Sequence, residues 1–358
     1  MGKHFAALCA LVLLLGMASC NPTSTSLTGP TSKPPVERIV FLRWLPQPDT
    51  AGNFEYLETF DSSGKEFRLS PGTGVLDVQG RNMIWNNQVA FDKAGNSYKG
   101  YEVTDLAGNH GPTLALVTDY VKLSPNAQQI AYRVEPTASG PVSARIYIIN
   151  SDGTGEYQIV SNLDPSSGFT FSPDGKKLAF FSIAPKGSPD TLQIIDVPPM
   201  RNSENKIIGI RSIATAFVPS APAAASSFWS SKNVLFYTDS DHIFTINSDG
   251  TNKHYVADGM PSSWSPDGTM LAFTMMNGPS SDLFITPDLG LTNIQLTNTT
   301  DLGEGDAHWS ADASKIIVTG SVVGSQSFDW VLEEIDMKTK TVTCRGGSGC
   351  AFGQYVQQ

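Results

Sequence analysis

Residues 261–276 have the sequence PSSWSPDGTMLAFTMM, an aromatic residue followed by a tight turn and a short apolar strand. Three further segments share this pattern: FTFSPDGKKLAFFS from Phe169, VKLSPNAQQIAYRV from Val121 and AHWSADASKIIVTG from Ala307. The segments start at residues 121, 169, 261 and 307, so two neighbouring pairs recur after 48 and 46 residues, a period typical of stacked supersecondary units.

The turn within this segment has a clear chemical basis. Pro266 presets φ at the second turn position, Asp267 suits the third, and Gly268 accepts the left-handed conformation that follows. The flanking segments are therefore two antiparallel strands. A second turn signal, Asn-Ser-Asp-Gly-Thr, lies between strand-like runs at residues 150–154 and 247–251. Each unit thus contains four antiparallel strands in about 45 residues, which predicts a β-propeller blade.

The repeats carry a family resemblance. The units that start near residues 121, 169, 261 and 307 resemble the TolB-type propeller repeat, in which an aromatic residue precedes Ser-Pro-Asp-Gly and the unit ends in Gln-Leu-Thr, here residues 295–297. The resemblance implies an all-β propeller and covers about two thirds of the chain. We find no counterpart of the α/β domain that TolB carries, so the resemblance implies a fold rather than TolB's own partners.

The number and closure of the blades follow from the register of the repeats. We expect seven four-stranded blades, with six as the alternative if one of the first two, more divergent units is not a blade. The first unit, from Val36, lacks an innermost strand. The C-terminal segment, residues 351–356, alternates apolar and polar residues and is predicted to supply that strand, which removes free sheet edges.

The N-terminus has the layout of a bacterial lipoprotein signal. Residues 1–19 combine Lys3 with an apolar run too short to span a membrane. They end at Cys20 in a segment that resembles a lipobox, which implies that Cys20 is lipidated, although an ordinary signal peptide cut nearby is the alternative. Residues 20–35 are rich in Ser, Thr and Pro and are predicted to form a disordered tether. The propeller then occupies residues 36–358.

Charge excludes one class of partner. The formal net charge is −10, and it becomes −11 without Lys3. With no basic cluster to neutralise phosphates, the chain is not expected to bind nucleic acid. Membrane attachment would depend on the acyl chains, which places the protein at the bacterial envelope, on the outer membrane facing the periplasm or on the cell surface.

Four cysteines require separate explanations. Cys9 lies in the signal segment and Cys20 is the predicted lipidation site. Cys344 and Cys350 are expected to form a disulfide in an oxidising compartment, since no neighbouring cysteine or histidine completes a zinc site.

The search for catalytic chemistry finds no catalytic residue, cofactor or metal site. Ser348 lies in a glycine-rich loop that lacks the strand–turn–helix context of a nucleophile elbow. Metal-dependent lyases on related propellers gather several histidines at the channel, whereas the strand register here places only His308 on an innermost strand. The Asp-Gly turns lack the ligand spacing of a calcium loop.

Acidic residues that precede the inner strands form the remaining candidate site. The register places Asp119, Asp258, Asp301, Glu304 and Asp306 at one mouth of the channel, with His308 beside them. A concave cluster of carboxylates would attract a cation or a basic segment. The alternative is a solvated rim of an acidic protein.

These features predict a lipid-anchored binding or scaffolding platform for an envelope protein, a peptide or a glycan. The alternative is a polysaccharide lyase or hydrolase with its site in the propeller funnel.

The lipid anchor has a direct test. Replacing Cys20 with alanine removes the only thiol at the predicted processing site, so the Cys20→Ala protein should move from the membrane fraction to the soluble fraction of lysed cells. Continued sedimentation of this variant with membranes would contradict the lipoprotein prediction.

Overall fold

The computed structural model describes residues 37–44, 55–60, 66–71, 77–79, 82–91, 97–105, 111–116, 118, 120–135, 143–165, 167–216, 229–288, 291–324, 330–346 and 350–357. The predicted signal peptide, Cys20, the tether, His110 and Asp119 lie outside these residues.

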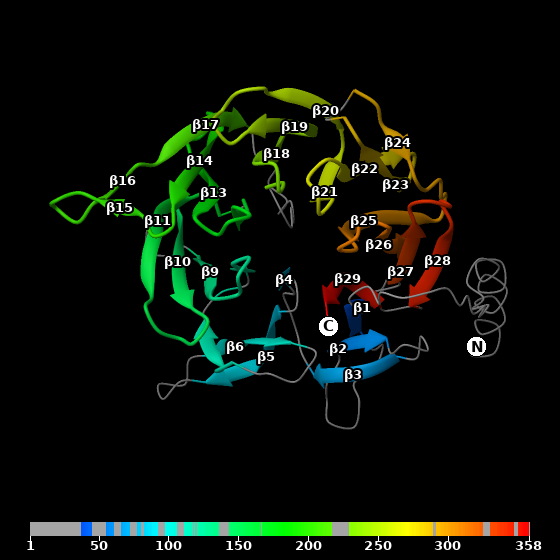
Figure 1. The fold of residues 1–358 in the computed structure, drawn as a ribbon, viewed down its shortest axis with the longest axis horizontal. Coiled ribbons are helices and arrows are strands. Elements are labelled where there is room, and N and C mark those ends of the chain that lie inside the picture. The colour runs from blue at the N-terminus through cyan, green and yellow to red at the C-terminus, as the bar shows by residue number, and fades with distance from the viewer. Residues whose placement is uncertain are drawn as a thin grey trace, which may run out of the picture.

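Every regular element in the described residues is a β-strand, and the strands form seven successive sheets around a common axis (Figure 1). From the innermost strand outward, the first three blades contain β29 (Cys350–Gln357), β1 (Glu37–Trp44), β2 (Glu55–Phe60) and β3 (Glu66–Pro71); β4 (Asp77–Gln79), β5 (Asn82–Phe91), β6 (Ser97–Asp105) and β7 (Leu114–Leu116); and β8 (Val121–Leu123), β9 (Gln129–Val134), β10 (Ala144–Asn150) and β11 (Tyr157–Leu163).

The remaining four blades follow the same order. They contain β12 (Phe169–Phe171), β13 (Lys177–Ser182), β14 (Asp190–Asp196) and β17 (Arg211–Ala216); a bridge at Trp229, β18 (Val234–Asp239), β19 (His242–Asn247) and β20 (His254–Asp258); β21 (Met260–Trp264), β22 (Leu271–Asn277), β23 (Ser280–Thr286) and β24 (Ile294–Gln295); and β25 (Leu302–Trp309), β26 (Lys315–Val322), β27 (Trp330–Asp336) and β28 (Val342–Gly346). The predicted all-β propeller with seven blades is confirmed.

The two ends of the described chain meet in the first blade. Strand β29 pairs antiparallel with β1, from Glu37 opposite Gln357 to Arg43 opposite Cys350. In Figure 1 the red C-terminal strand lies beside the blue first strand. The last strand of the chain is therefore the innermost strand of the first blade, as its alternating pattern predicted.

Apolar side chains fill the spaces between neighbouring blades. Between blades six and seven, for example, Leu283 and Ile285 pack with Val318 and Ile335. Between blades seven and one, Ile317 and Leu332 pack with Phe41. Both faces of an inner blade are thus buried, which explains why strands such as β13 (KLAFFS) are almost continuously apolar.

A short hairpin projects outward from the fourth blade (Figure 1). It pairs β15 (Met200–Arg201) with β16 (Ile207–Ile208) and lies between β14 and β17 in the chain. No helix in the described part of the chain is long and apolar enough to cross a membrane.

The Ser-Pro-Asp-Gly turn is stabilised by its own side chains. Ser265 Oγ donates to Asp267 Oδ1 at 2.6 Å and accepts from the backbone N–H of Met270 at 2.9 Å. Gly268 has φ +70°, the left-handed conformation that the sequence predicted. In the two turns without glycine, Ala127 and Ala313 adopt the same conformation, at φ +56° and +57°. The side-chain hydrogen bonds therefore impose the turn even where an alanine Cβ disfavours it.

This strain gives a stability prediction. Ala127→Gly and Ala313→Gly should each raise the free energy of unfolding by about 0.5–1 kcal/mol, because relief of the left-handed alanine exceeds the entropy that glycine adds to the unfolded chain. Urea unfolding of the full chain measures the effect.

A reverse substitution is the matched control. Gly175 occupies the equivalent position in the fourth blade at φ +70°, and a Cβ there would meet only Pro125 Cδ, at 3.6 Å. Gly175→Ala should therefore lower stability by about 1 kcal/mol through backbone conformation alone. Destabilisation by both alanine-to-glycine changes would show that the alanines are not strained.

Candidate functional site

The innermost strands converge on the axis and bring charged side chains together. Lys122 lies at the centre of β8, and its Nζ is 3.1 Å from Oδ1 of Asp77 on β4 of the neighbouring blade. The other carboxylate oxygen of Asp77 accepts the backbone N–H of Leu123 at 2.7 Å. Both charged side chains are about nine-tenths buried or more. This ion pair therefore joins the inner strands of blades two and three.

A second pair reaches the same region from blade seven. Asp306 and His308 alternate along β25, and His308 Nε2 is 2.9 Å from Asp306 Oδ2. Both side chains are mostly buried. The charges of Asp306 and Lys122 influence each other's ionisation, so side chains from three blades form one electrostatic cluster, which we call the axial cluster: Asp77, Lys122, Asp306 and His308.

Mutual attraction keeps this cluster charged. Burial alone would lower the pKa of Lys122, but the opposing charge of Asp77 and its hydrogen bond raise that pKa well above the ordinary lysine value. Burial likewise acts to raise the pKa of Asp306, yet His308 and then Lys122 hold it below the usual aspartate value. At neutral pH Lys122 is therefore an ammonium ion and Asp306 an ionised carboxylate.

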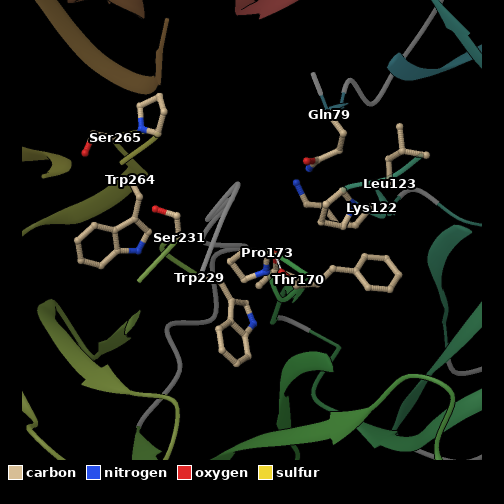
Figure 2. Close-up of a pocket in the computed structure, with 12 residues that line it drawn as sticks. Gln79, Lys122, Leu123, Thr170, Pro173, Trp229, Ser231, Trp264 and Ser265 are labelled. Atoms are coloured by element: carbon tan, nitrogen blue, oxygen red, sulfur yellow. Dashed lines mark hydrogen bonds between the residues drawn. The ribbon is translucent and has the colours of Figure 1, made fainter. Parts of the chain in front are cut away.

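A cavity of about 290 Å³ lies beside the axial cluster. Each inner strand starts at one end of the channel, which we call the mouth end, and leads into its Ser-Pro-Asp-Gly turn at the other, which we call the turn end. The cavity lies at the turn end. In Figure 2, Gln79, Lys122 and Leu123 line one side of this space, and Trp229, Ser231 and Trp264 line the other. Phe171 and the turn residues Pro125, Pro173 and Pro266 also contribute. Five successive blades therefore build the wall.

The composition of this wall determines what it can do. Ring edges and prolines supply apolar contact, while the Gln79 amide, the Ser231 hydroxyl and the Lys122 ammonium supply hydrogen-bonding groups. A concave site with apolar walls and a few converging polar groups is the usual form of a ligand pocket.

The residues predicted at the mouth do not all come together. Asp306 and His308 contact each other inside the channel, whereas Asp301 is exposed at the start of β25. Glu304 is only 2% exposed and lies between blades six and seven, so it is not available to a ligand at the mouth.

Asp258 has different neighbours from the rest of the predicted set. It ends β20, the outermost strand of blade five, where its carboxylate contacts His242 at 2.5 Å and accepts from the Tyr255 hydroxyl at 2.7 Å. The hydrogen bonds from Tyr255 and then His242 lower its pKa. It therefore does not belong to the axial cluster.

The two C-terminal cysteines lie on the two strands that the predicted disulfide would join. Cys344 belongs to β28, the outermost strand of blade seven, and Cys350 begins β29. The side chain of Cys350 is outside the described atoms, so the pairing stays a prediction.

Sequence reasoning missed Lys122, Asp77 and the turn-end cavity. One signal was available: Lys122 is a charged residue in the middle of VKL, an inner strand whose three residues are all buried. A lysine in such a strand needs a buried partner. Its identity could not be found locally, because Asp77 lies 45 residues away.

No three His, Cys, Asp or Glu side chains come together as metal ligands within the part of the chain that the structure describes. His254 lies on the outermost strand β20, and His308 on the innermost strand β25, as the register predicted.

No family model and no curated protein matches this sequence. Similar solved structures include a puromycin-hydrolysing peptidase from Mycobacterium tuberculosis, which is 14% identical with a TM-score of 0.59 over 87% of this chain and 53% of the peptidase. An oligogalacturonate lyase in complex with manganese is 16% identical, with a TM-score of 0.54 over 87% and 85% of the two chains. A putative TolB from Agrobacterium tumefaciens is 14% identical, with a TM-score of 0.46 over 88% and 92%.

These similarities concern the fold. The chain spans about half the length of the peptidase, and the activities in these names belong to those proteins. With the seven blades built from the sequence repeats, the protein is a β-propeller.

The buried ion pair predicts a large mutational effect. Lys122→Met should lower the free energy of unfolding by about 3–5 kcal/mol, because Asp77 remains buried without its cation. Adding Asp77→Leu should recover part of this loss. Lys177→Met is the matched control: its pair with Asp196 is about 40% exposed and should contribute less than about 1 kcal/mol. Equal losses for the two lysine variants in urea unfolding would contradict the assignment.

Proposed function

We propose that this protein is a lipid-anchored, extracytoplasmic propeller that holds a protein, peptide or glycan at the bacterial envelope. The supporting observation is the axial site: residues from five blades surround the turn-end cavity, and Lys122 links it to the axial cluster. Because the wall comes from separate blades of one rigid ring, a ligand would meet a preorganised surface, which reduces the entropy cost of binding.

The pairing of the axial charges suits a binding site. His308 is engaged by Asp306, and Lys122 is engaged by Asp77. Charges that are already hydrogen-bonded hold a defined geometry and can orient a polar ligand. Degradation of a bound glycan would instead support a lyase or hydrolase.

The domain order supports attachment to an envelope membrane. Residues 1–19 serve as the signal segment, Cys20 carries the acyl chains, residues 20–35 form the tether and residues 36–358 form the propeller. The acyl chains provide the membrane contact, because a net charge of −10 repels anionic lipid surfaces.

Blocking variants test the proposal at each end of the channel. Ser231 is exposed and lines the cavity, so Ser231→Trp should fill the entrance without disturbing the core. Asp301→Lys reverses an exposed charge at the mouth. The full chain and each variant are used to capture envelope proteins from detergent extracts and to bind a panel of envelope glycans. Loss of about tenfold or more in capture by either variant supports an axial binding site.

Two neighbouring exposed residues supply matched controls. Lys232 follows Ser231 in the same turn but does not line the cavity, and Asp241 lies in the turn that precedes β19. Lys232→Trp and Asp241→Lys should capture as much as the parent. Equal capture by all four variants, or binding to none of the extracts and glycans, would refute the proposed function. Cleaved glycan in the eluate would replace it with the enzymatic alternative.

A further inference from the structure

Two glutamates at the junction of blades six and seven have unusual surroundings. Glu304 on β25 lies opposite Gly320, and Glu333 on β27 lies opposite Val318. Since residues 318 and 320 are two apart on β26, all four positions share one face of blade seven. Val318 packs against Leu283 of blade six. The two glutamates therefore face blade six, and we call them the junction carboxyls.

The junction carboxyls are buried and incompletely hydrogen-bonded. Glu304 is 2% exposed and Glu333 is 8% exposed. Oε1 of Glu304 accepts a hydrogen bond from Thr299 Oγ1 at 3.0 Å. Oε2 of each glutamate is buried with no hydrogen-bond partner among the described residues. Such an atom is costly in its ionised form, because neither water nor a donor stabilises the charge.

The charged groups that act on the junction carboxyls are all acidic. Glu333 and Asp282, from β27 and β23, act on Glu304, and Asp301 acts on Glu333. Strand β26 contributes Gly320 and Val318 opposite them, and the segment after β24 contributes only the hydroxyls of Thr297 and Thr299.

Asp282 already has its own hydrogen-bond donors. Its carboxylate is fully buried and accepts hydrogen bonds from Asn277 Nδ2, Gln295 Nε2 and the backbone N–H of Thr299, at 2.7, 2.9 and 2.9 Å. Asp282 therefore adds a second acidic side chain near Glu304 and no donor for it.

Glu334 shows the contrast within one strand. It follows Glu333, points to the opposite face and pairs with Lys315 at 2.9 Å and with Arg345. These pairs lower its pKa although burial acts to raise it. Burial raises the pKa of Glu333, with Asp301 adding to the shift, and burial raises the pKa of Glu304 to about 7, helped by Glu333 and Asp282.

A proton satisfies this arrangement better than a metal ion. Within the described residues no three ligating side chains converge as a metal site. Protonation removes the charge of a buried carboxyl, so its oxygens no longer need a cation or several donors.

We propose that the junction of blades six and seven is a proton-sensitive contact: the buried carboxyls of Glu304 and Glu333 bind protons more tightly than exposed glutamates do, and their ionisation as the pH rises weakens the contact near the channel mouth. Asp301, which is exposed and acts electrostatically on Glu333, connects the junction to that mouth. The inference depends on the packing of the blades and not on the proposed binding function.

The sign of the effect follows from proton linkage. A carboxyl that binds its proton more tightly in the folded protein contributes stability that is complete below the unfolded-state value, near 4.3, and is lost as the pH rises through about 7. The melting temperature of the full chain should therefore fall between pH 5.5 and pH 8.5.

Neutral isosteres test the assignment. Glu304→Gln mimics the protonated side chain, because its amide is neutral and of the same size. The melting temperature of the variant minus that of the parent should therefore increase by about 3 °C between pH 5.5 and pH 8.5. Burial and Asp164 raise the pKa of Asp190 to about 6, so ionisation of Asp190 also changes the melting temperature over this pH range. The quantity to compare is therefore the difference in melting temperature between variant and parent.

Glu334→Gln is the matched control from the same strand. It removes a salt-bridged carboxylate that is ionised throughout this range, so it should lower the melting temperature equally at both pH values. The proposal would be overturned if the melting temperatures of Glu304→Gln and the parent fell by the same amount between pH 5.5 and pH 8.5.

A direct titration covers the case in which Glu304→Gln does not fold. In protein labelled with ¹³C at the glutamate carboxyl, two resonances should titrate above 4.5, one of them near 7, and Glu333→Gln should remove the other. If every glutamate titrates at or below about 4.5, the junction does not bind protons near neutral pH and the proposal fails.

Discussion

The backbone pairing between β1 and β29 is the contact on which the ring depends. Seven sheets arranged around an axis leave an unpaired edge on the first blade unless a strand from the far end of the chain completes it. Residues 350–357 supply that strand, so pairing over more than 300 residues of sequence separation joins the two ends. Blades one and seven then pack through Phe41, Ile317 and Leu332, which places all seven inner strands around the same axis.

Convergence of the inner strands explains the chemistry of the channel. Side chains that point toward the axis from different blades approach one another closely, so any charge there must meet an opposite charge or lose its own. Lys122 meets Asp77, and Asp306 meets His308. The result is a polar centre that resists hydrophobic collapse and leaves the turn end of the channel open as a cavity.

Blade seven shows that the environment, and not the residue type, sets the behaviour of a carboxyl. Glu333 and Glu334 are neighbours in one strand, yet the alternation of a β-strand sends them to opposite faces. Glu333 is buried at the junction with blade six, where Asp301 acts on it, while Glu334 faces Lys315 and Arg345. The same chemical group is therefore driven toward its neutral form on one face and its ionised form on the other.

Local chemistry was visible in the sequence because it depends on residues a few positions apart. The Ser265 to Met270 turn, the strands on either side and the blade period all follow from short-range hydrogen bonds and alternation, and the closing strand follows from counting strands in the repeat. His308 could be placed on an inner strand by the same register. By itself, the sequence therefore determined the propeller, its blades and its closure.

Only the tertiary structure decided which side chains meet. Lys122 and Asp77 belong to different blades, and Glu304, predicted to lie at the mouth, is buried against blade six because β25 contains a bulge between Glu304 and Ala307. A bulge changes the alternation that assigns side chains to faces. Contacts between blades depend on the twist and packing of whole sheets, and a repeat pattern carries no information on them.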